Sequence, residues 1–137
     1  MPSTEADHLA KLKAVSGTAA FNNWLDLKVN SATEGLVELS LPWRKEFGQY
    51  NGFLHASIVA GLIDTACGFA ASTLSGPVLA SQLAVRFLRP AVADFFVVRG
   101  TVVKPGRQQI FARAELFGQG ASDKLFAVGD ALLVPVV

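Results

Sequence analysis

Residues 55–74 read HASIVAGLIDTACGFAASTL, and this stretch decides the fold. Its apolar residues occur nearly all round a helical projection, which predicts about five turns of helix. A helix that is apolar on most sides is enclosed by other elements rather than resting on a surface. Asp64, several hydroxyl residues and the lack of aromatic or basic anchors argue against a membrane span. The stretch therefore predicts a helix buried inside a protein.

Four strands are predicted after this helix. Their sequences are rich in β-branched and aromatic residues, or alternate between apolar and polar side chains. In residues 108–117, for example, Ile110, Ala112, Ala114 and Leu116 share one face. The turns between strands contain Pro90, the run Lys104–Arg107 and residues 118–122. The predicted strands are residues 79–88, 94–103, 108–117 and 124–134.

Before the helix the chain predicts one more helix and two strands. Residues 3–15 read as an amphipathic helix with Ser3 or Thr4 as cap and Leu9, Leu12 and Val15 on one side. Residues 24–29 read as a strand and residues 31–35 as a turn. Residues 36–41 alternate, with Val37, Leu39 and Leu41 pointing one way, and residues 44–54 form a loop.

This order predicts an α+β fold in which an antiparallel sheet surrounds one long helix. We expect a single domain over residues 1–137, with residues 1–20 as an N-terminal helical segment. One five-turn helix cannot cover both faces of the sheet. The other face needs a partner, most simply a second copy of the chain.

Composition narrows the function further. The net charge of +1 gives no reason to expect a nucleic acid or a membrane as partner. The N-terminus lacks the apolar core of a signal peptide, so we expect a cytoplasmic protein. Cys67 is the only cysteine, which excludes an internal disulfide, and His8 and His55 without acidic companions predict no metal site. No phosphate-binding glycine motif is present, so no nucleotide cofactor is expected.

The loop and the start of the long helix carry a specific motif. Residues 49–56 read QYNGFLHA, and Asp64 follows the histidine by nine positions. This motif resembles the signature of hotdog-fold acyl-CoA thioesterases, and it is most similar to the 4-hydroxybenzoyl-CoA and phenylacetate-degradation branches. The runs RFLRPA (86–91) and VKPGR (103–107) resemble later parts of the same family. The resemblance covers roughly residues 20–135.

The resemblance implies roles for four residues. The Gln49 side chain and the backbone N–H of Ala56 would hold the thioester carbonyl. Asp64 would attack it or activate the attacking water, and His55 would support the loop. The family often has two glycines where this chain has Ala56-Ser57, but a backbone N–H can still serve. Some relatives place a hydroxyl residue where this chain has Ala80, beside Ser81.

The resemblance also implies substrate contacts from the loop, the third strand and the following turn. Residues 65–114 contain six basic residues and one acidic residue. These basic residues form either a solvated face of the sheet or a binding site for the CoA phosphates. The substrate-contacting residues would be Asn51, Gly52, Ser81, Arg89, Lys104, Gly106 and Arg107.

Other interpretations exist for the titratable residues. Asp64 could be a buried carboxylate satisfied by Thr65 or nearby backbone. His55 is a general base or, as we favour, a histidine that hydrogen-bonds the loop. Cys67 is interpreted as inert packing, and His8 as a surface residue.

Helix geometry constrains the site independently. At ~1.5 Å rise per residue, Ala56 and Asp64 of one chain lie roughly 12 Å apart along the helix. Groups that act on one carbonyl must lie within ~3 Å of its atoms. If both residues act on one substrate, the site spans two chains, which predicts a homo-oligomer, at least a dimer and by resemblance a dimer of dimers.

The resemblance thus implies hydrolysis of an aryl or medium-chain acyl-CoA. Two alternatives stay open. A hydroxyacyl thioester dehydratase on the same fold would use His55 as base, and a non-catalytic acyl-CoA-binding protein would bind without turnover.

Overall fold

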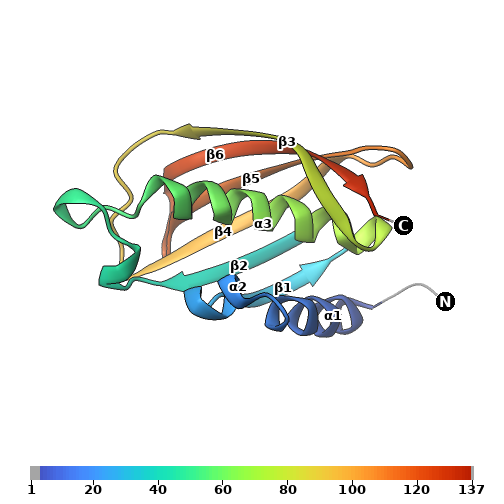
Figure 1. Cartoon of the computed structure of the whole chain (residues 1–137), viewed down its shortest axis with the longest axis horizontal. Helices are drawn as coiled ribbons and strands as arrows, with labels where there is room; N and C mark the ends of the chain where they lie inside the picture. Colours follow the sequence, from blue (N-terminus) through green and yellow to red (C-terminus); the bar gives the residue numbers. More distant parts are fainter. Residues whose placement is uncertain (1–3, 137) are drawn as a thin grey trace.

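The computed structural model describes residues 4–136, which form a six-stranded antiparallel sheet with one long helix, α3, across one face (Figure 1). The strands lie in the order β1-β2-β4-β5-β6-β3, so β1 and β3 are the edges. This arrangement confirms the predicted α+β class and the hotdog fold. The elements are α1 (Glu5–Gly17), α2 (Ala20–Leu25), β1 (Lys28–Thr33), β2 (Leu36–Pro42), η1 (Lys45–Phe47), η2 (Tyr50–Gly52), α3 (Ala56–Ser75), β3 (Val78–Phe87), β4 (Phe95–Lys104), β5 (Ile110–Gly118) and β6 (Ala121–Pro135).

The helix α3 lies very close to the sheet. An added Cβ at Gly100 of β4 would stand 2.3 Å from the carbonyl oxygen of Ala66, so only glycine fits there. The most apolar 18-residue window of α3 has a mean hydropathy of 1.4, enough by composition alone for a membrane span. In the structure that apolar surface packs on the strands. The side that faces them consists of Ile58, Val59, Leu62, Ile63, Ala66, Cys67, Ala70 and Ala71.

The predicted alternation along the strands is confirmed. On β2, Val37, Leu39 and Leu41 are buried beneath α3, and their neighbours lie on the other face. On β5, the residues from Ile110 to Leu116 alternate in the same way. This period-two burial fixes the register, because a shift of one residue would place every apolar side chain on the wrong face.

The strand predicted at residues 24–29 is wrong. Residues 20–25 form the short helix α2, and Asp26 ends it in the left-handed region at φ 55°. The strand β1 therefore starts at Lys28 and continues to Thr33, and the turn to β2 is narrower than predicted, with Gly35 at φ 74°.

The helix α1 packs against β1 with a side that matches the predicted one only in part, because Leu12 is buried and Leu9 packs against the core. Thr4 caps it, and its hydroxyl accepts a hydrogen bond from Asp7 N at 3.1 Å, whereas Ser3 lies outside the described residues. His8, Leu12 and Ser16 form the buried side, while Val15 is 55% exposed. The prediction that His8 is a surface residue is wrong, because it sits four residues before the buried Leu12 on the inward side.

The edge strand β3 is apolar and exposed. Leu79, Leu83 and Phe87 are 67%, 39% and 55% exposed, and β3 pairs only with β6 within residues 4–136. A long apolar edge strand with free backbone groups readily pairs with another strand.

Candidate active site

The first turn of α3 is shaped by His55, which caps the helix with its own side chain. The Nδ1 atom of His55 accepts hydrogen bonds from Ser57 N at 3.0 Å and Ser57 Oγ at 2.7 Å. Its carbonyl oxygen accepts from Ile58 N, and its backbone N–H donates to Phe47 O at 2.8 Å. His55 therefore joins the preceding loop to the helix through its backbone, while its side chain serves the helix.

This capping leaves one amide of the first turn available. The N–H groups of Ser57 and Ile58 have acceptors on His55, and that of Ala56 has none among residues 4–136. An unpaired N–H at a helix N-terminus, where the helix dipole is positive, favours a negatively charged oxygen. Such a group suits the oxyanion of a tetrahedral intermediate.

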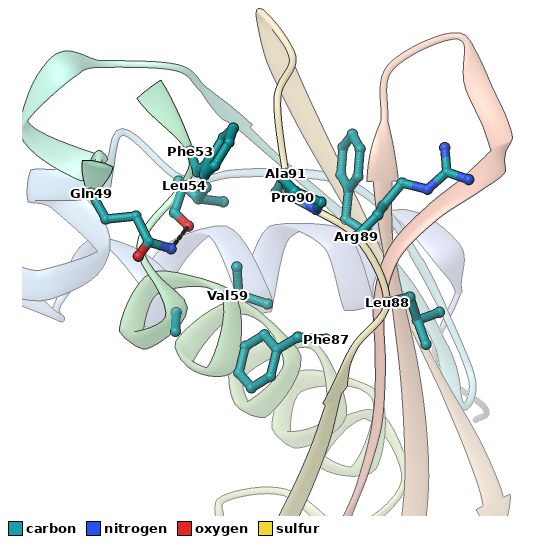
Figure 2. A pocket seen from close by; sticks show the side chains of 11 residues that line it. Gln49, Phe53, Leu54, Val59, Phe87, Leu88, Arg89, Pro90 and Ala91 are labelled. Carbon is teal, nitrogen blue, oxygen red and sulfur yellow. Dashed lines mark hydrogen bonds between the residues drawn. The ribbon is translucent and has the colours of Figure 1, made fainter. Parts of the chain in front are cut away.

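Gln49 lines the same cleft as this amide. Its Nε2 atom donates to Leu54 O at 3.2 Å, and its backbone N–H donates to Phe53 O at 2.7 Å, so the loop fixes the side chain (Figure 2). The carboxamide nitrogen carries two hydrogens, and one bond to Leu54 leaves the second able to donate.

Gln49 and Ala56 line the same cleft, which has a volume of about 420 Å³. Figure 2 shows Arg89 and Phe87 on the other side of this cleft, from the end of β3 and the residues after it. The structure thus brings Gln49 and Ala56 of one sequence motif together with Arg89, which lies more than 30 residues further along the chain. The remaining walls include Val59, Phe87, Leu88 and Phe126.

Asp64 does not line this cleft. It lies two turns along α3 on the half-buried side, and burial raises the pKa of its carboxyl above the ordinary value of 3.8. The hydroxyl of Thr65 donates to Gly61 O at 2.8 Å and so does not satisfy the carboxylate. Within one chain, the structure keeps Asp64 apart from Gln49 and Ala56, as the helical rise requires.

Cys67 is fully buried among apolar residues. Burial first, and then the negative charges of Asp64 and Asp130, raise the pKa of its thiol to about 12. Because the thiolate is the nucleophilic form, this thiol is unreactive at neutral pH, in agreement with a packing role. Within the described part of the chain, no group of three or more possible metal ligands comes together.

The other predicted contact residues are spread over the molecule. Asn51 and Gly52 form a left-handed turn at φ 60° and 74° in the loop, and both are exposed. Ser81 sits at a β-bulge of β3, where its hydroxyl donates to Leu132 O at 3.4 Å.

The basic turn after β4, residues 104–107, lies at the opposite end of α3 from the cleft. Val102 N donates to Gly35 O, and Gly35 N in turn binds the Thr73 hydroxyl at 2.7 Å, near the C-terminus of α3. A helix of 20 residues is ~30 Å long. One chain therefore does not bring Lys104, Gly106 and Arg107 together with Arg89. Gly106 has no room for a Cβ, which would stand 2.4 Å from Gln109 O.

Comparison with known proteins agrees with this geometry. The family model of the thioesterase superfamily matches residues 51–122, which include the end of the loop, α3 and the strands β3, β4 and β5. A thioesterase family protein from Silicibacter pomeroyi is 33% identical with a TM-score of 0.85, covering 93% of this chain and 96% of its own. The PaaI protein of the phenylacetic acid degradation operon of E. coli is 20% identical with a TM-score of 0.89, covering 98% and 97% of the two chains, and shows the same fold.

A sequence relative from Saccharolobus solfataricus, named "Putative esterase", is 30% identical over 94 residues, or 67% of each chain. The matched model spans more than half of the chain, and the relatives carry thioesterase and esterase names, so a thioesterase-type hydrolase function is supported. The chain belongs to the thioesterase superfamily.

Proposed function

We propose that this protein hydrolyses an acyl-CoA thioester to the free acid and CoA. The observation that carries the proposal is that the residue with the unpaired N–H, Ala56, and the Gln49 carboxamide line one cleft. Two hydrogen-bond donors in one cleft can stabilise the developing oxyanion of a thioester.

In the proposed reaction the thioester carbonyl oxygen accepts hydrogen bonds from Ala56 N–H and from Gln49 Nε2. Asp64 then either removes a proton from an attacking water or attacks the carbonyl carbon itself, with water cleaving the resulting anhydride. In both routes the C–S bond breaks, the CoA thiolate leaves and one water is consumed. The raised pKa of Asp64 makes it a better proton acceptor than an ordinary carboxylate.

The proposed site needs two copies of the chain. Ala56 and Asp64 are ~12 Å apart along one helix, so Asp64 must come from a second α3 that runs antiparallel to the first. The exposed apolar edge at β3 supports such a partner, because pairing two β3 strands would bury Leu79, Leu83 and Phe87. Assembly into a dimer of dimers and a cytoplasmic location stay predictions.

The antiparallel arrangement of two α3 helices also suggests a phosphate-binding role for the basic turn, residues 104–107. In an antiparallel partner, the C-terminus of α3, and with it Lys104 and Arg107, would lie toward the same end as the cleft that Arg89 lines. We propose that Arg89 and the partner copy's turn bind the CoA phosphates.

Release of thiol from a panel of aryl and aliphatic acyl-CoAs, measured with a chromogenic thiol reagent, tests the proposal. We expect turnover of at least one class, and expect Asp64→Asn to abolish it. Acyl-CoA binding without release of thiol would instead establish a binding protein. Loss of water from a hydroxyacyl-CoA without release of thiol would establish a dehydratase, although the bonds from Ser57 to His55 Nδ1 give His55 a capping role.

A further inference from the structure

A cavity of about 480 Å³ lies between α1 and the C-terminal end of α3. Its volume falls within the ~300–1,000 Å³ that is typical of small-molecule sites. Among residues 4–136, this cavity shares no lining residue with the cleft at the start of α3. Ser72 on its wall lies 16 residues after Ala56, and therefore ~24 Å further along the helix. Within one chain the cavity is separate from the candidate active site.

One face of α1 forms a wall of this cavity. His8, Lys11, Leu12 and Val15 line it, and they follow the i, i+3, i+4, i+7 spacing of a single helix face. The nitrogen-bearing side chains of His8 and Lys11 come first along the helix, and the apolar Leu12 and Val15 come next. This wall therefore has a polar part and an apolar part.

His8 carries a polar atom that the fold leaves without a partner. The residue is 8% exposed, and its Nε2 atom is hidden from solvent and has no hydrogen-bond partner among residues 4–136. A buried polar group without a partner is rare in proteins, because its loss of hydration is not compensated. Since His8 lines a cavity, a ligand there can supply the missing partner. A cavity of this size has room for more than a water molecule, which occupies ~30 Å³ in the liquid.

The wall that α3 provides offers no comparable polar group. The Ser72 hydroxyl donates to Phe69 O at 2.8 Å, and the Thr73 hydroxyl donates to Ala70 O at 2.7 Å, so both already have partners within the helix. Leu74, which also lines the cavity, is apolar and 42% exposed. An apolar ligand body placed against this wall would remove that surface from water.

We propose that this cavity binds a small monocarboxylic acid with an apolar body. The carboxylate accepts a hydrogen bond from His8 Nε2 and pairs with the Lys11 ammonium group. The body of the ligand covers Val15 and Leu74. A neutral imidazole with its proton on Nε2 and an imidazolium can both donate this bond, so the interaction does not require a charged His8.

The charges around the cavity favour a carboxylate over an amine. No aspartate or glutamate lines the cavity among residues 4–136, whereas His8 and Lys11 do. The carboxylate of Asp7, next to His8 in the sequence, is occupied by the backbone N–H of Thr4 at 3.1 Å. An ammonium ligand would therefore meet Lys11 without a compensating anion from the cavity wall.

The two histidines of the chain provide the readout. Protein labelled with ¹⁵N in histidine gives ring resonances for His8 and His55 only, and His8→Leu assigns them. We expect titration with hexanoate to shift the His8 ring resonances until they saturate. The His55 ring, at the first turn of α3, is the internal reference and should not follow the same binding curve. Hexanoate that shifts His55 and leaves His8 unchanged binds in the cleft, and this result would overturn the proposal.

Three variants, measured by isothermal titration calorimetry, test the assigned contacts. Loss of the hydrogen bond in His8→Leu should raise the Kd for hexanoate by about tenfold or more. Lys11→Gln removes one exposed charge and should raise it roughly two- to fivefold. Lys13→Gln is the matched control, because Lys13 is exposed on the same helix and does not line this cavity, and it should leave the Kd unchanged.

The ligand class is tested with compounds of equal chain length. Hexan-1-ol that binds as tightly as hexanoate would show that apolar contacts alone fill the cavity, and tighter binding of hexylamine would reverse the charge assignment. Equal Kd values in Lys11→Gln and Lys13→Gln would remove Lys11 from the site, even where His8→Leu fails to fold. The inference does not rest on the proposed thioesterase function, because every readout is binding rather than turnover.

Discussion

Asp64 has the combination of burial and missing local partner that is typical of a catalytic carboxylate. It is half-buried on α3, and the adjacent Thr65 hydroxyl bonds to Gly61 instead. Asp64→Asn keeps the shape and removes the charge. If Asp64 is base or nucleophile, kcat falls by at least ~10²–10⁴-fold while the circular dichroism spectrum stays the same. A fully active variant would exclude Asp64 from the chemistry.

The same substitution has a predictable effect on stability. The folded-state pKa of Asp64 is raised by burial, so the folded chain holds its proton more tightly than the unfolded chain. Its contribution to stability is therefore greatest below the ordinary pKa of 3.8 and is lost as pH rises through the raised value. At neutral pH the charge is unfavourable, and Asp64→Asn should raise the melting temperature. A lower melting temperature at pH 7 would show that the carboxylate is satisfied in the assembled protein.

The raised pKa also predicts a pH profile. Only the ionised carboxylate accepts a proton or attacks, so kcat should rise with pH through the Asp64 pKa and then level off. Because burial raises that pKa, the rise should be centred above the ordinary value of 3.8. A profile of kcat measured over the acidic range locates the midpoint. A rate that does not change across this range contradicts the assignment.

At the scale of elements, the start of α3 depends on one unusual cap. His55 Nδ1 accepts the Ser57 N–H, and loss of a side-chain cap typically lowers stability by ~0.5–2 kcal/mol. We expect His55→Ala to lower the free energy of unfolding, measured in urea, by about this amount. It should also lower kcat, because the Ala56 N–H is no longer held in place. His55→Asn is the matched variant, since asparagine is a good cap and should recover most of both losses. Loss of kcat in both variants with stability intact would give His55 a chemical role.

The turn between β4 and β5 is proposed to bind phosphate rather than to take part in catalysis. Arg107→Ala should therefore raise KM for acyl-CoA much more than it lowers kcat, because ground and transition states hold the phosphates equally. The effect should shrink with acyl-pantetheine thioesters, which lack the nucleotide. Equal losses on both substrates would show that the turn is structural.

The elements differ in how well the sequence predicted them. The bounds of the helix α3 and of the strands after it were predicted to within a few residues, because a long apolar pattern fits only one type of secondary structure. Residues 24–29 were predicted as a strand, but Trp24 and Leu25 belong to the short helix α2, whose six residues with two aromatic rings carry no clear period. The buried side of α1 was predicted only in part. Leu12 is buried as expected, whereas Ser16 was missed because it is polar and becomes acceptable inside only through the hydrogen bond from Asn22 Nδ2, at 3.2 Å.

The candidate site was predicted in its parts but not in its arrangement. The motif at residues 49–56 led to Gln49 and Ala56, and the structure places both in one cleft. Sequence spacing did not reveal that Arg89 joins them while the turn at Lys104 lies at the far end of α3. Which strand ends meet depends on the strand order, and that order follows from tertiary packing rather than from local patterns.

At the scale of the whole molecule, the proposed active site is completed by a second copy, and this can be tested without a structure of the dimer. Gln49→Ala and Asp64→Asn should each be nearly inactive alone. In a mixed dimer with a shared site, one site carries both changes and the other carries neither. Co-expression with separate affinity tags and purification through both yields this mixed dimer.

We expect the mixed dimer to recover about half of the unmodified activity, because two-fold symmetry leaves one of its two sites intact. Each variant alone should retain at most about one hundredth, the usual effect of losing one oxyanion donor. The control is a mixed dimer of Asp64→Asn with an Asp64→Asn, Gln49→Ala double variant, which contains no intact site and should stay inactive. Failure of the first mixed dimer to recover activity, with dimer formation verified by sedimentation, would place both residues in the same chain's site. Because the helical rise separates Ala56 from Asp64 by ~12 Å, that result would also remove Ala56 as the oxyanion donor.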